Sequence, residues 1–367
     1  MMIGVKEKIT SGQLMILIIQ TQIGIGILFL PSTVEAVAKN DAWISVLMAG
    51  VASSLMILIM WALSRRFPSM ILFDYLPLLL GKIAGKIVHV IYAMLFILEC
   101  SLVMVMFADV VRDWVFASTP IWVILALMLG TSVYMAVARI QLIARFFVLT
   151  FGLIFVLILI STYAYRDADI MYILPVNGVG FPSIFKGMEK SLSSLFGFEI
   201  LLLCYPNVIG VSKKILKAAM FGNIFSTCIY SFLVFTCLIV FSPEELRVIP
   251  QPVLYMVKSL SFTVFERADL YFLTIWVVVV VSTVISYLFM SAKSVSTLFG
   301  KKKHAGSVPV VALIILIISL IPHNQEMVNM LQNIVAGIAA VAIIVVPPIL
   351  LGISYLLKIK GKEQTKG

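Results

Sequence analysis

The stretch QTQIGIGILFLP, residues 20–31, decides the fold. It lies inside a long apolar segment, yet it contains two glutamines, Gly24, Gly26 and a closing Pro31. Glycine and proline weaken a helix more than other residues do, and a backbone in lipid must satisfy its own N–H and C=O groups. A helix break at this position therefore indicates a cavity lined by protein, water or ligand. The alternative interpretation is that the glycines only allow neighbouring helices to pack closely.

The composition is that of a membrane protein. Of 367 residues, 62% are hydrophobic and 12% are charged, and the mean hydropathy is +1.13, which excludes the soluble globular class. Apolar stretches of membrane-spanning length predict ten transmembrane helices in a single all-α membrane domain, residues 1–367. The ten stretches are residues 14–37, 42–63, 87–111, 120–138, 146–164, 188–209, 216–241, 270–292, 308–322 and 332–357.

The positive charges orient these ten spans. If the N-terminus is cytoplasmic, 19 of the 27 lysines and arginines lie on the inner side and 8 on the outer side, as the positive-inside rule requires. The outer eight are Lys39, Arg112, Arg166, Lys186, Lys190, Arg247, Lys258 and Arg267. Both termini are then cytoplasmic, and residues 358–367 form a basic cytoplasmic tail. We expect the first span to remain uncleaved, because its apolar run is long for a signal peptide.

Two stretches between spans do not read as simple loops. Residues 165–187 contain Pro175, Gly178, Gly180 and Pro182, and we interpret them as an irregular connection. Residues 243–266 mix apolar and charged side chains, which predicts a helix lying on the outer face.

The chain offers little for catalysis or metal binding. The cysteines lie within apolar runs and the histidines are scattered, so we expect no disulfide framework, no metal site and no cofactor. They are Cys100, Cys204, Cys228, Cys237, His89, His304 and His323. Because no nucleophile, base and metal occur together in the pattern, we expect that the protein is not an enzyme. Its positive charge follows membrane topology, so we also expect no nucleic-acid partner.

A second interrupted span makes the first one informative. SLFGFEILLLCYP, residues 194–206, repeats the order of glycine, apolar residues and proline seen at residues 23–31. The two segments are five spans apart, and a five-span unit repeated once inserts its second copy upside down. This pattern predicts a 5+5 inverted repeat, approximately residues 10–164 and 188–357, with discontinuous helices 1 and 6 and a ligand site near the midplane.

The two breaks supply the candidate ligand-binding residues. A half-helix that begins after a break points its positive end at the cavity and suits a carboxylate, while the preceding half-helix offers carbonyl groups to an ammonium. A small zwitterion fits both. The predicted ligand-binding residues are Gln22, Gly24, Ile25, Gly26, Phe196, Gly197, Phe198 and Glu199.

Two acids lie near the middle of apolar spans, Glu99 and Glu199. A carboxylate at this depth costs about 2.5–3.5 kcal/mol even on lenient scales, so its default interpretation is functional. Glu199 has three possible roles, which are to accept from freed backbone amides, to bind a ligand ammonium or to carry a proton. Glu99 is a candidate for a proton or polar-network role, and the alternative for both is that they only tie helices together.

Hydroxyl groups in span eight are candidates for an ion site. Ser282, Thr283 and Ser286 lie at a depth where they could supply oxygens to a sodium ion beside the first break. Membrane serines and threonines more often donate to their own helix carbonyls, which is the alternative here.

With these residues assembled, the chain resembles the B-subunit family of spore germinant receptors (GerAB-like spore germination permeases) within the amino acid–polyamine–organocation superfamily. The segments that carry the resemblance are IGIGILFLP at 23–31, FDYLPLLLGKIAGKI at 73–87, Glu99, LFGFEILLLCYPNV at 195–208 with Lys213 and Lys214, ERADLYFLTIWVVVVVS at 266–282 and SAKSVSTLFG at 291–300. They extend along nearly the whole chain.

The resemblance implies a LeuT-like fold in the inner membrane of a bacterial spore and a small germinant, such as an amino acid, as the ligand. It also implies assembly with a larger membrane A subunit and a lipoprotein C subunit. By this resemblance Gly24 and Gly26 match the span-one break, Gly197 and Glu199 match the span-six break, and Glu99 matches the span-three acid. Further candidate specificity positions are Thr21, Gln22, Phe196 and Phe198.

Three functions remain open from the sequence. The protein is a ligand-sensing receptor subunit that triggers germination, an ion-coupled amino acid transporter of the same fold, or a scaffold whose breaks bind nothing. The resemblance favours the first. The absence of any lysine in span five leaves the coupling ion of a transporter unidentified.

Overall fold

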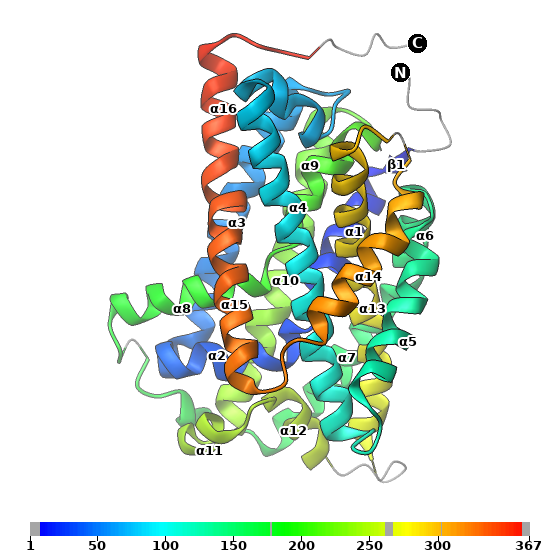
Figure 1. Ribbon diagram of the computed structural model, residues 1–367. Helices are drawn as coiled ribbons and strands as arrows, with labels where there is room; N and C mark the ends of the chain where they lie inside the picture. The colour runs from blue at the N-terminus through cyan, green and yellow to red at the C-terminus, as the bar shows by residue number, and fades with distance from the viewer. Residues whose placement is uncertain (1–7, 177, 261–266, 302, 362–367) are drawn as a thin grey trace.

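Helices cover each of the ten apolar stretches (Figure 1). The computed structural model describes residues 8–176, 178–260, 267–301 and 303–361. The helices of the first half are α1 (Ser11–Gln22), α2 (Gly26–Ala38), α3 (Ala42–Arg66), α4 (Leu72–Trp114), α5 (Ile121–Ala136), α6 (Ile140–Thr150) and α7 (Gly152–Thr162). The main helices of the second half are α8 (Phe181–Ser194), α9 (Leu201–Cys204), α10 (Ser212–Val240), α13 (Ala268–Leu298), α14 (Val308–Ser319), α15 (Gln325–Ala339) and α16 (Val346–Leu356).

The lengths of these helices identify a membrane protein. Within the described residues, six helical segments are long and apolar enough to cross a bilayer. They are Gly26–Arg66, Leu72–Trp114, Ile140–Arg166, Ser212–Val240, Ala268–Leu298 and Gln325–Leu356. Two shorter apolar helices, Ile121–Ala136 and Ala305–Ser319, accompany them.

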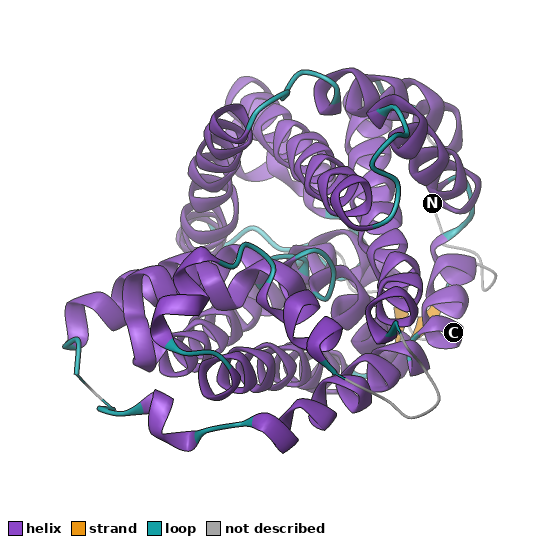
Figure 2. Cartoon of the chain, turned by 90° about the horizontal axis from the view of Figure 1, so that it is seen from below, coloured by secondary structure: helices purple, strands orange, loops and turns teal. Residues whose placement is uncertain are grey.

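Helix α1 occupies the centre of the bundle. It packs against α10, α6 and α13, while α13 packs against α4 and α10 against α3. Every residue of α1 from Leu17 to Gln22 is buried, as expected of a helix surrounded by others. Figure 2, seen from the end of the bundle where α11 and α12 lie in Figure 1, shows that helices make up nearly all of the chain.

Two helices begin earlier than the sequence analysis predicted. Helix α4 begins at Leu72 instead of near residue 87, and Gly81, with φ of 79°, separates its two helical parts. Helix α8 begins at Phe181 instead of 188, directly after Gly180 with φ of 77°. Pro182 lies in the first turn of α8, where proline is favourable because no N–H is needed there. Its assignment to an irregular connection was therefore wrong.

The last apolar stretch contains an unpredicted irregularity. A π-helical segment, Ala340–Val345, joins α15 to α16. Pro347 and Pro348 follow it and have no N–H to donate. The hydroxyl of Tyr92 on α4 donates to the carbonyl of Ala342, so a carbonyl within the irregular segment has a partner from another helix.

A short parallel ladder, two residues in each strand, joins the segment before α1 to the segment after α9. Strand β1 (Ile9–Thr10) precedes α1 and pairs with β2 (Val208–Ile209), which follows α9, with Ile9 opposite Val208. Thr10 also caps α1: its Oγ1 accepts from the N–H of Gln13, and Oε1 of Gln13 accepts from the N–H of Thr10. The chain before α1 is thus fixed to the chain after α9.

The predicted outer helix consists of two short helices, α11 (Pro243–Val248) and α12 (Pro252–Ser259), and residues 261–266 of that prediction lie outside the described residues. Pro250 and Pro252 separate the two helices, because proline disfavours a helical conformation in the residue before it. In Figure 1 both lie at the end of the bundle opposite to β1 and to the end of α16.

Candidate functional site

The chain leaves helical geometry between α1 and α2. Helix α1 ends at Gln22, Ile23 is extended with φ of −84° and ψ of 104°, and α2 begins at Gly26. The freed carbonyls of this segment accept hydrogen bonds from side chains of α10 and α13. Tyr230 donates to the carbonyl of Gln22 over 2.8 Å, and the indole of Trp276 donates to that of Gly24 over 3.4 Å.

Thr283 on α13 bridges two further carbonyls of the same segment. Its Oγ1 donates toward the carbonyl of Gln20 at 3.2 Å and toward that of Ile23 at 3.3 Å. The break is therefore held open by three side chains that satisfy its backbone, as a non-helical segment at membrane depth requires.

The two glycines of this break allow protein side chains to approach closely. A Cβ on Gly24 would lie 2.5 Å from Oγ1 of Thr283. A Cβ on Gly26 would lie 2.9 Å from the hydroxyl of Tyr230 and 3.0 Å from Ser194. Close packing, the alternative interpretation, thus gives a physical reason for both glycines. The absence of a side chain at these positions also lets Thr283 and Tyr230 come near enough to donate to the carbonyls of the break.

The second interruption follows α8. Gly197 has φ of 121°, and a 3₁₀ turn, Phe198–Ile200, leads into α9. Glu199 is fully buried and uses both carboxylate oxygens: Oε2 accepts from the N–H of Gly197 over 2.7 Å, and Oε1 accepts from the hydroxyl of Tyr287 over 3.1 Å. A carboxylate of this chain therefore accepts from the freed N–H at the second break.

The two interruptions touch each other. Nε2 of Gln22 donates to the carbonyl of Leu195, at the end of α8, over 2.6 Å. A Cβ on Gly197 would lie 2.9 Å from the backbone carbon of Thr21. The two breaks, which are about 170 residues apart along the chain, therefore form one structural unit.

A buried amide chain fixes the orientation of Gln22. Its Nε2 also donates to Oδ1 of Asn223 over 2.9 Å, and Oδ1 accepts from Ser53 as well. Nδ2 of Asn223 donates to the carbonyl of Gly50 and to Ser54. Because Nε2 of Gln22 serves two acceptors, its Oε1 must be the atom turned away from them. This oxygen is buried and accepts no hydrogen bond from the described residues.

A cavity of about 360 Å³ lies beside the two breaks. It has the size of a small-ligand site. Its wall combines backbone of the first break, polar side chains and apolar side chains from α2, α4, α8, α13 and α15. The lining residues include Thr21, Gln22, Gly24, Ile25, Gly26, Phe29, Glu99, Met106, Lys190, Phe196, Thr283, Tyr287, Gln332 and Asn333.

The predicted site residues divide into two groups. Gln22, Gly24, Ile25, Gly26, Phe196, Glu99 and Thr283 line this cavity. Gly197, Phe198, Glu199 and Ser282 do not belong to its lining, and Glu199 reaches it only through the hydroxyl of Tyr287.

The sequence analysis missed Tyr287 and the polar pair Gln332 and Asn333 on α15. The pair stands inside the tenth apolar stretch, and two amides there were a readable signal of a polar wall. Tyr287 gave no such signal, because one tyrosine in a long apolar helix most simply reads as packing.

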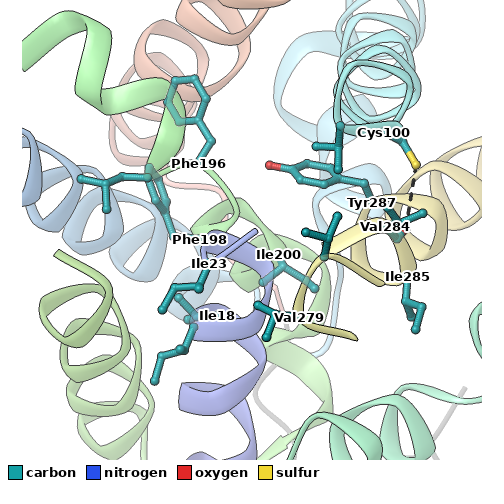
Figure 3. Close-up of a cluster of buried hydrophobic side chains, with 14 of the residues drawn as sticks. Ile18, Ile23, Cys100, Phe196, Phe198, Ile200, Val279, Val284, Ile285 and Tyr287 are labelled. Atoms are coloured by element: carbon teal, nitrogen blue, oxygen red, sulfur yellow. Dashed lines mark hydrogen bonds between the residues drawn. The ribbon is translucent and has the colours of Figure 1, made fainter. Parts of the chain in front are cut away.

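Apolar side chains form the surroundings of the breaks (Figure 3). Ile18 comes from α1 and Ile23 from the first break. Phe196 and Phe198 come from the second break, and Tyr287 comes from α13. In Figure 3 the hydroxyl of Tyr287 points across the cluster toward the side where Phe196 lies. The polar groups of the cavity are therefore set in a largely apolar shell, which strengthens any charge interaction made inside it.

The candidate ion-binding hydroxyls are engaged in hydrogen bonds. Ser282 donates to the carbonyl of Val278, and Ser286 donates to that of Ser282 and accepts from Thr21. Thr283 donates to the two carbonyls of the first break. Within the part of the chain that the structure describes, no group of three or more His, Cys, Asp or Glu residues is arranged to bind a metal ion.

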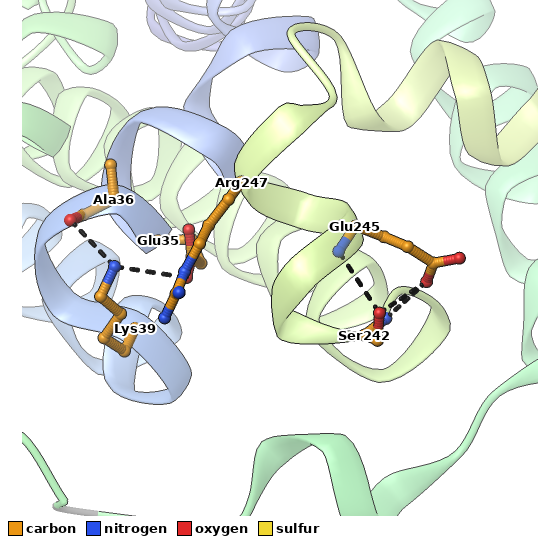
Figure 4. Close-up of polar contacts among 6 residues, drawn as sticks. All are labelled: Glu35, Ala36, Lys39, Ser242, Glu245 and Arg247. Atoms are coloured by element: carbon orange, nitrogen blue, oxygen red, sulfur yellow. Dashed lines mark hydrogen bonds and ion pairs between the residues drawn. The ribbon is translucent and has the colours of Figure 1, made fainter.

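Charged residues join α2 to α11 (Figure 4). The buried carboxylate of Glu35 lies 3.6 Å from Nζ of Lys39 and 3.8 Å from Nε of Arg247. Ser32 adds a 3.3 Å hydrogen bond to the carbonyl of Pro250. The half-helix that begins at the first break is thus attached to the two short outer helices.

A family model described as "Spore germination protein" matches residues 8–328. The chain belongs to the spore germination protein family. Spore germination protein GerQB of Bacillus cereus is 29% identical over 95% of this chain and 96% of that protein. Spore germination protein YndE of Bacillus subtilis (strain 168) is 27% identical over 95% and 96%.

Two solved structures show the fold of this spore germination protein. Mhp1, a nucleobase-cation-symport-1 family transporter in a closed conformation with bromovinylhydantoin bound, superposes with a TM-score of 0.70 at 13% identity, over 96% of this chain and 80% of Mhp1. MhsT in complex with L-phenylalanine gives 0.70 at 13% identity, over 96% and 99%. The expected helical, LeuT-like fold is thereby confirmed.

Proposed function

We propose that this protein is the membrane subunit of a nutrient germinant receptor, which binds a small germinant beside the two breaks and triggers spore germination. The observation that carries the proposal is the cavity of about 360 Å³, which is lined by backbone of the first break and by Phe196 of the second. In a family of spore germination proteins, a ligand-sized cavity at this position supports a sensing role.

An amino acid is the class of germinant that the cavity suits best. The N–H groups of Gly26 and Ile27 at the start of α2 have no acceptor within their own helix, whereas that of Leu28 donates to the carbonyl of Ile25. Together with the helix dipole, these first groups favour a carboxylate. A protein of the same fold, MhsT, was solved in complex with L-phenylalanine. The carboxylate of a germinant would therefore lie against Gly24 to Gly26, and its side chain against Phe196 and the apolar wall.

The membrane arrangement that supports this site is a ten-span inverted repeat. We propose that α1 with α2 and α8 with α9 are discontinuous helices 1 and 6 of repeats 10–164 and 188–357. The placement of 19 of the 27 positive residues on the inner side supports cytoplasmic, spore-core termini in the spore inner membrane. Residues 1–7 and the tail residues 362–367 lie outside the described residues.

The partners of a receptor subunit follow from the family. We propose a complex with a larger membrane A subunit and a lipoprotein C subunit in the bilayer. The relatives of this chain include Spore germination proteins A2, B2 and KB of Bacillus subtilis (strain 168), which supports a place in the germination machinery.

A panel of nutrients on spores tests the proposal. Spores would carry the wild-type protein, Gly26→Leu or Gly130→Leu, and the amount of each protein in the inner membrane would be measured. Gly26→Leu should abolish the response to at least one nutrient, because its side chain enters the space taken by Tyr230 and Ser194. Gly130 faces open space, so Gly130→Leu should respond normally.

The same variants separate the three candidate functions. A normal response from spores that contain normal amounts of Gly26→Leu protein would favour the scaffold. Uptake of a radiolabelled amino acid by vesicles that contain the isolated protein would favour the transporter, a function that the shared fold with two transporters also suits.

A further inference from the structure

Glu99 is a buried acid without a partner. It lies on α4, is 8% exposed and lines the cavity. Within residues 8–176, 178–260, 267–301 and 303–361, no side chain or backbone group donates a hydrogen bond to its carboxylate, and no lysine, arginine or histidine forms an ion pair with it. An uncompensated carboxylate at this depth is unfavourable by several kcal/mol, so a cation or a proton must accompany it.

The other buried acid cannot take this role as readily. Both oxygens of Glu199 accept hydrogen bonds, from Gly197 and from Tyr287, and Glu199 does not belong to the cavity lining. Its carboxylate holds the second break together.

The backbone carbonyls of the first break are also engaged. The carbonyls of Gln20 and Ile23 accept from Thr283, that of Gln22 from Tyr230 and that of Gly24 from Trp276. An ammonium group in the cavity would have to compete with these donors for the carbonyl oxygens. The side-chain acceptors of the wall are thus its better partners.

Oε1 of Gln22 is a second acceptor, and it points away from the chain of amide hydrogen bonds. Oε1 of Gln22 is buried and unpaired, and the two hydrogen bonds from Nε2 fix its orientation. Gln22 and Glu99 line the same cavity. The other charged residues of the lining are Glu189 and Lys190, and both are exposed. The ammonium group of Lys190 is therefore hydrated and does not need Glu99 as a partner.

We infer that Glu99 is the counter-ion for the ammonium group of the germinant, with Oε1 of Gln22 as a further acceptor. This inference rests on the proposed function, since it assigns the amine end of the amino acid that the cavity would bind. The ammonium group is then bound by an acid on α4 and not by Glu199 or by the carbonyls of the first break. The ligand class that follows is a primary amine with a carboxylate, and an analogue without the amine should bind poorly.

Purified protein in lipid nanodiscs tests the inference. Binding of the 20 standard amino acids would be measured by calorimetry on the wild type. Each amino acid that binds would be compared with the carboxylic acid of the same carbon skeleton lacking the amine, for example L-alanine with propionate. The same pair would be measured on Glu99→Gln and on Asp109→Asn, a matched acid-to-amide change on α4 outside the cavity lining.

Wild type and Asp109→Asn should prefer the amino acid to its amine-free analogue by roughly 10- to 100-fold, the range of a charge-assisted hydrogen bond. Glu99→Gln should bind the amino acid roughly 10- to 100-fold more weakly and lose that preference, while its affinity for the analogue stays near the wild-type value. The retained analogue affinity shows that the cavity is intact. If Glu99→Gln does not fold, Glu99→Asp takes its place, and its affinity should fall for the amino acid alone.

Two results would overturn the inference, and they are distinguishable. An unchanged preference for the amine in Glu99→Gln, whether or not both affinities fall, would give Glu99 a purely structural role and leave the proposed function standing. If no amino acid binds to the wild-type protein, the inference and the proposed amino acid ligand fail together.

Discussion

The backbone N–H of Gly197 donates to Oε2 of Glu199 over 2.7 Å. This contact closes the second break on itself, because the acid that follows the glycine by two residues supplies the acceptor. The other oxygen of Glu199 accepts from Tyr287 on α13. One side chain therefore connects the interrupted segment to Tyr287, which lies 88 residues later in the chain.

Replacing Glu199 should loosen this connection. Glu199→Ala leaves a buried N–H and a buried hydroxyl without acceptors. At about 1–3 kcal/mol for each, the free energy of unfolding should fall by roughly 2–6 kcal/mol. Glu199→Gln keeps one acceptor oxygen and should lose less. Thermal unfolding of the purified protein in nanodiscs would measure both. Glu326→Ala, at an exposed acid on α15, should be near neutral. Equal stability of Glu199→Ala and the wild type would contradict the bracing role.

Gly197 should tolerate no side chain. Its φ of 121° is unfavourable for other residues, and an added Cβ would meet the backbone of Thr21 at 2.9 Å. Gly210 has φ of 135° but faces open space, so Gly210→Ala carries the backbone strain alone, about 1–2 kcal/mol. Gly197→Ala should lower the unfolding temperature clearly more than Gly210→Ala does. Equal shifts would show that contact with Thr21 is unimportant.

Ligand binding should not depend on sodium. The hydroxyl of Thr283 donates to the two carbonyls that a cation beside the first break would need, and Ser282 and Ser286 donate to carbonyls of their own helix. Amino acid affinity should therefore be the same in sodium chloride and in N-methyl-D-glucamine chloride at equal ionic strength. A loss of affinity without sodium that Thr283→Val reproduces would establish the ion site instead.

The outer helix α11 should loosen in acid. The N–H and the hydroxyl of Ser242 both donate to Oε2 of Glu245 over 2.9 Å, and these hydrogen bonds lower the pKa of Glu245 below its ordinary value. Because the folded pKa is lowered, the stabilisation is complete above the ordinary value and is lost as the pH falls through the lowered one. The pH window therefore lies below about 4.3.

Hydrogen–deuterium exchange of residues 243–248, corrected for intrinsic rates, would detect this. Exchange should accelerate between pH 6 and pH 3 in the wild type and become nearly independent of pH in Glu245→Gln. Glu244→Gln changes the neighbouring exposed acid and should behave as the wild type. A pH response that survives Glu245→Gln would assign it to another group.

The breaks were predictable because their signals are local. Glycines one residue apart and a closing proline weaken a helix wherever they occur, and the comparable segment around Gly197 stood five spans later. The partners that hold the breaks were not predictable. Tyr287 meets Glu199, and Asn223 meets Gln22, across separations that no local pattern encodes. For the same reason the sequence suggested a ligand role for Glu199, whereas both of its oxygens have partners within the protein.

Boundaries failed where a residue has two common roles. Pro182 reads as a loop residue or as the first turn of a helix, and the second applies in α8. Gly81, with φ of 79°, interrupts α4, and the helical residues from Leu72 to Leu80 before it lie outside the predicted third span. Strands β1 and β2, of two residues each, are too short to show an alternating pattern.

The pairing of Ile9 with Val208 has a mechanical consequence. It ties the segment before the first interrupted helix to the segment after the second, so these two ends must move together or first separate two strands. A molecule that passes between these ends would have to wait for that separation. A signal needs no such passage, since the joined segments can tilt as one unit while the strands stay paired.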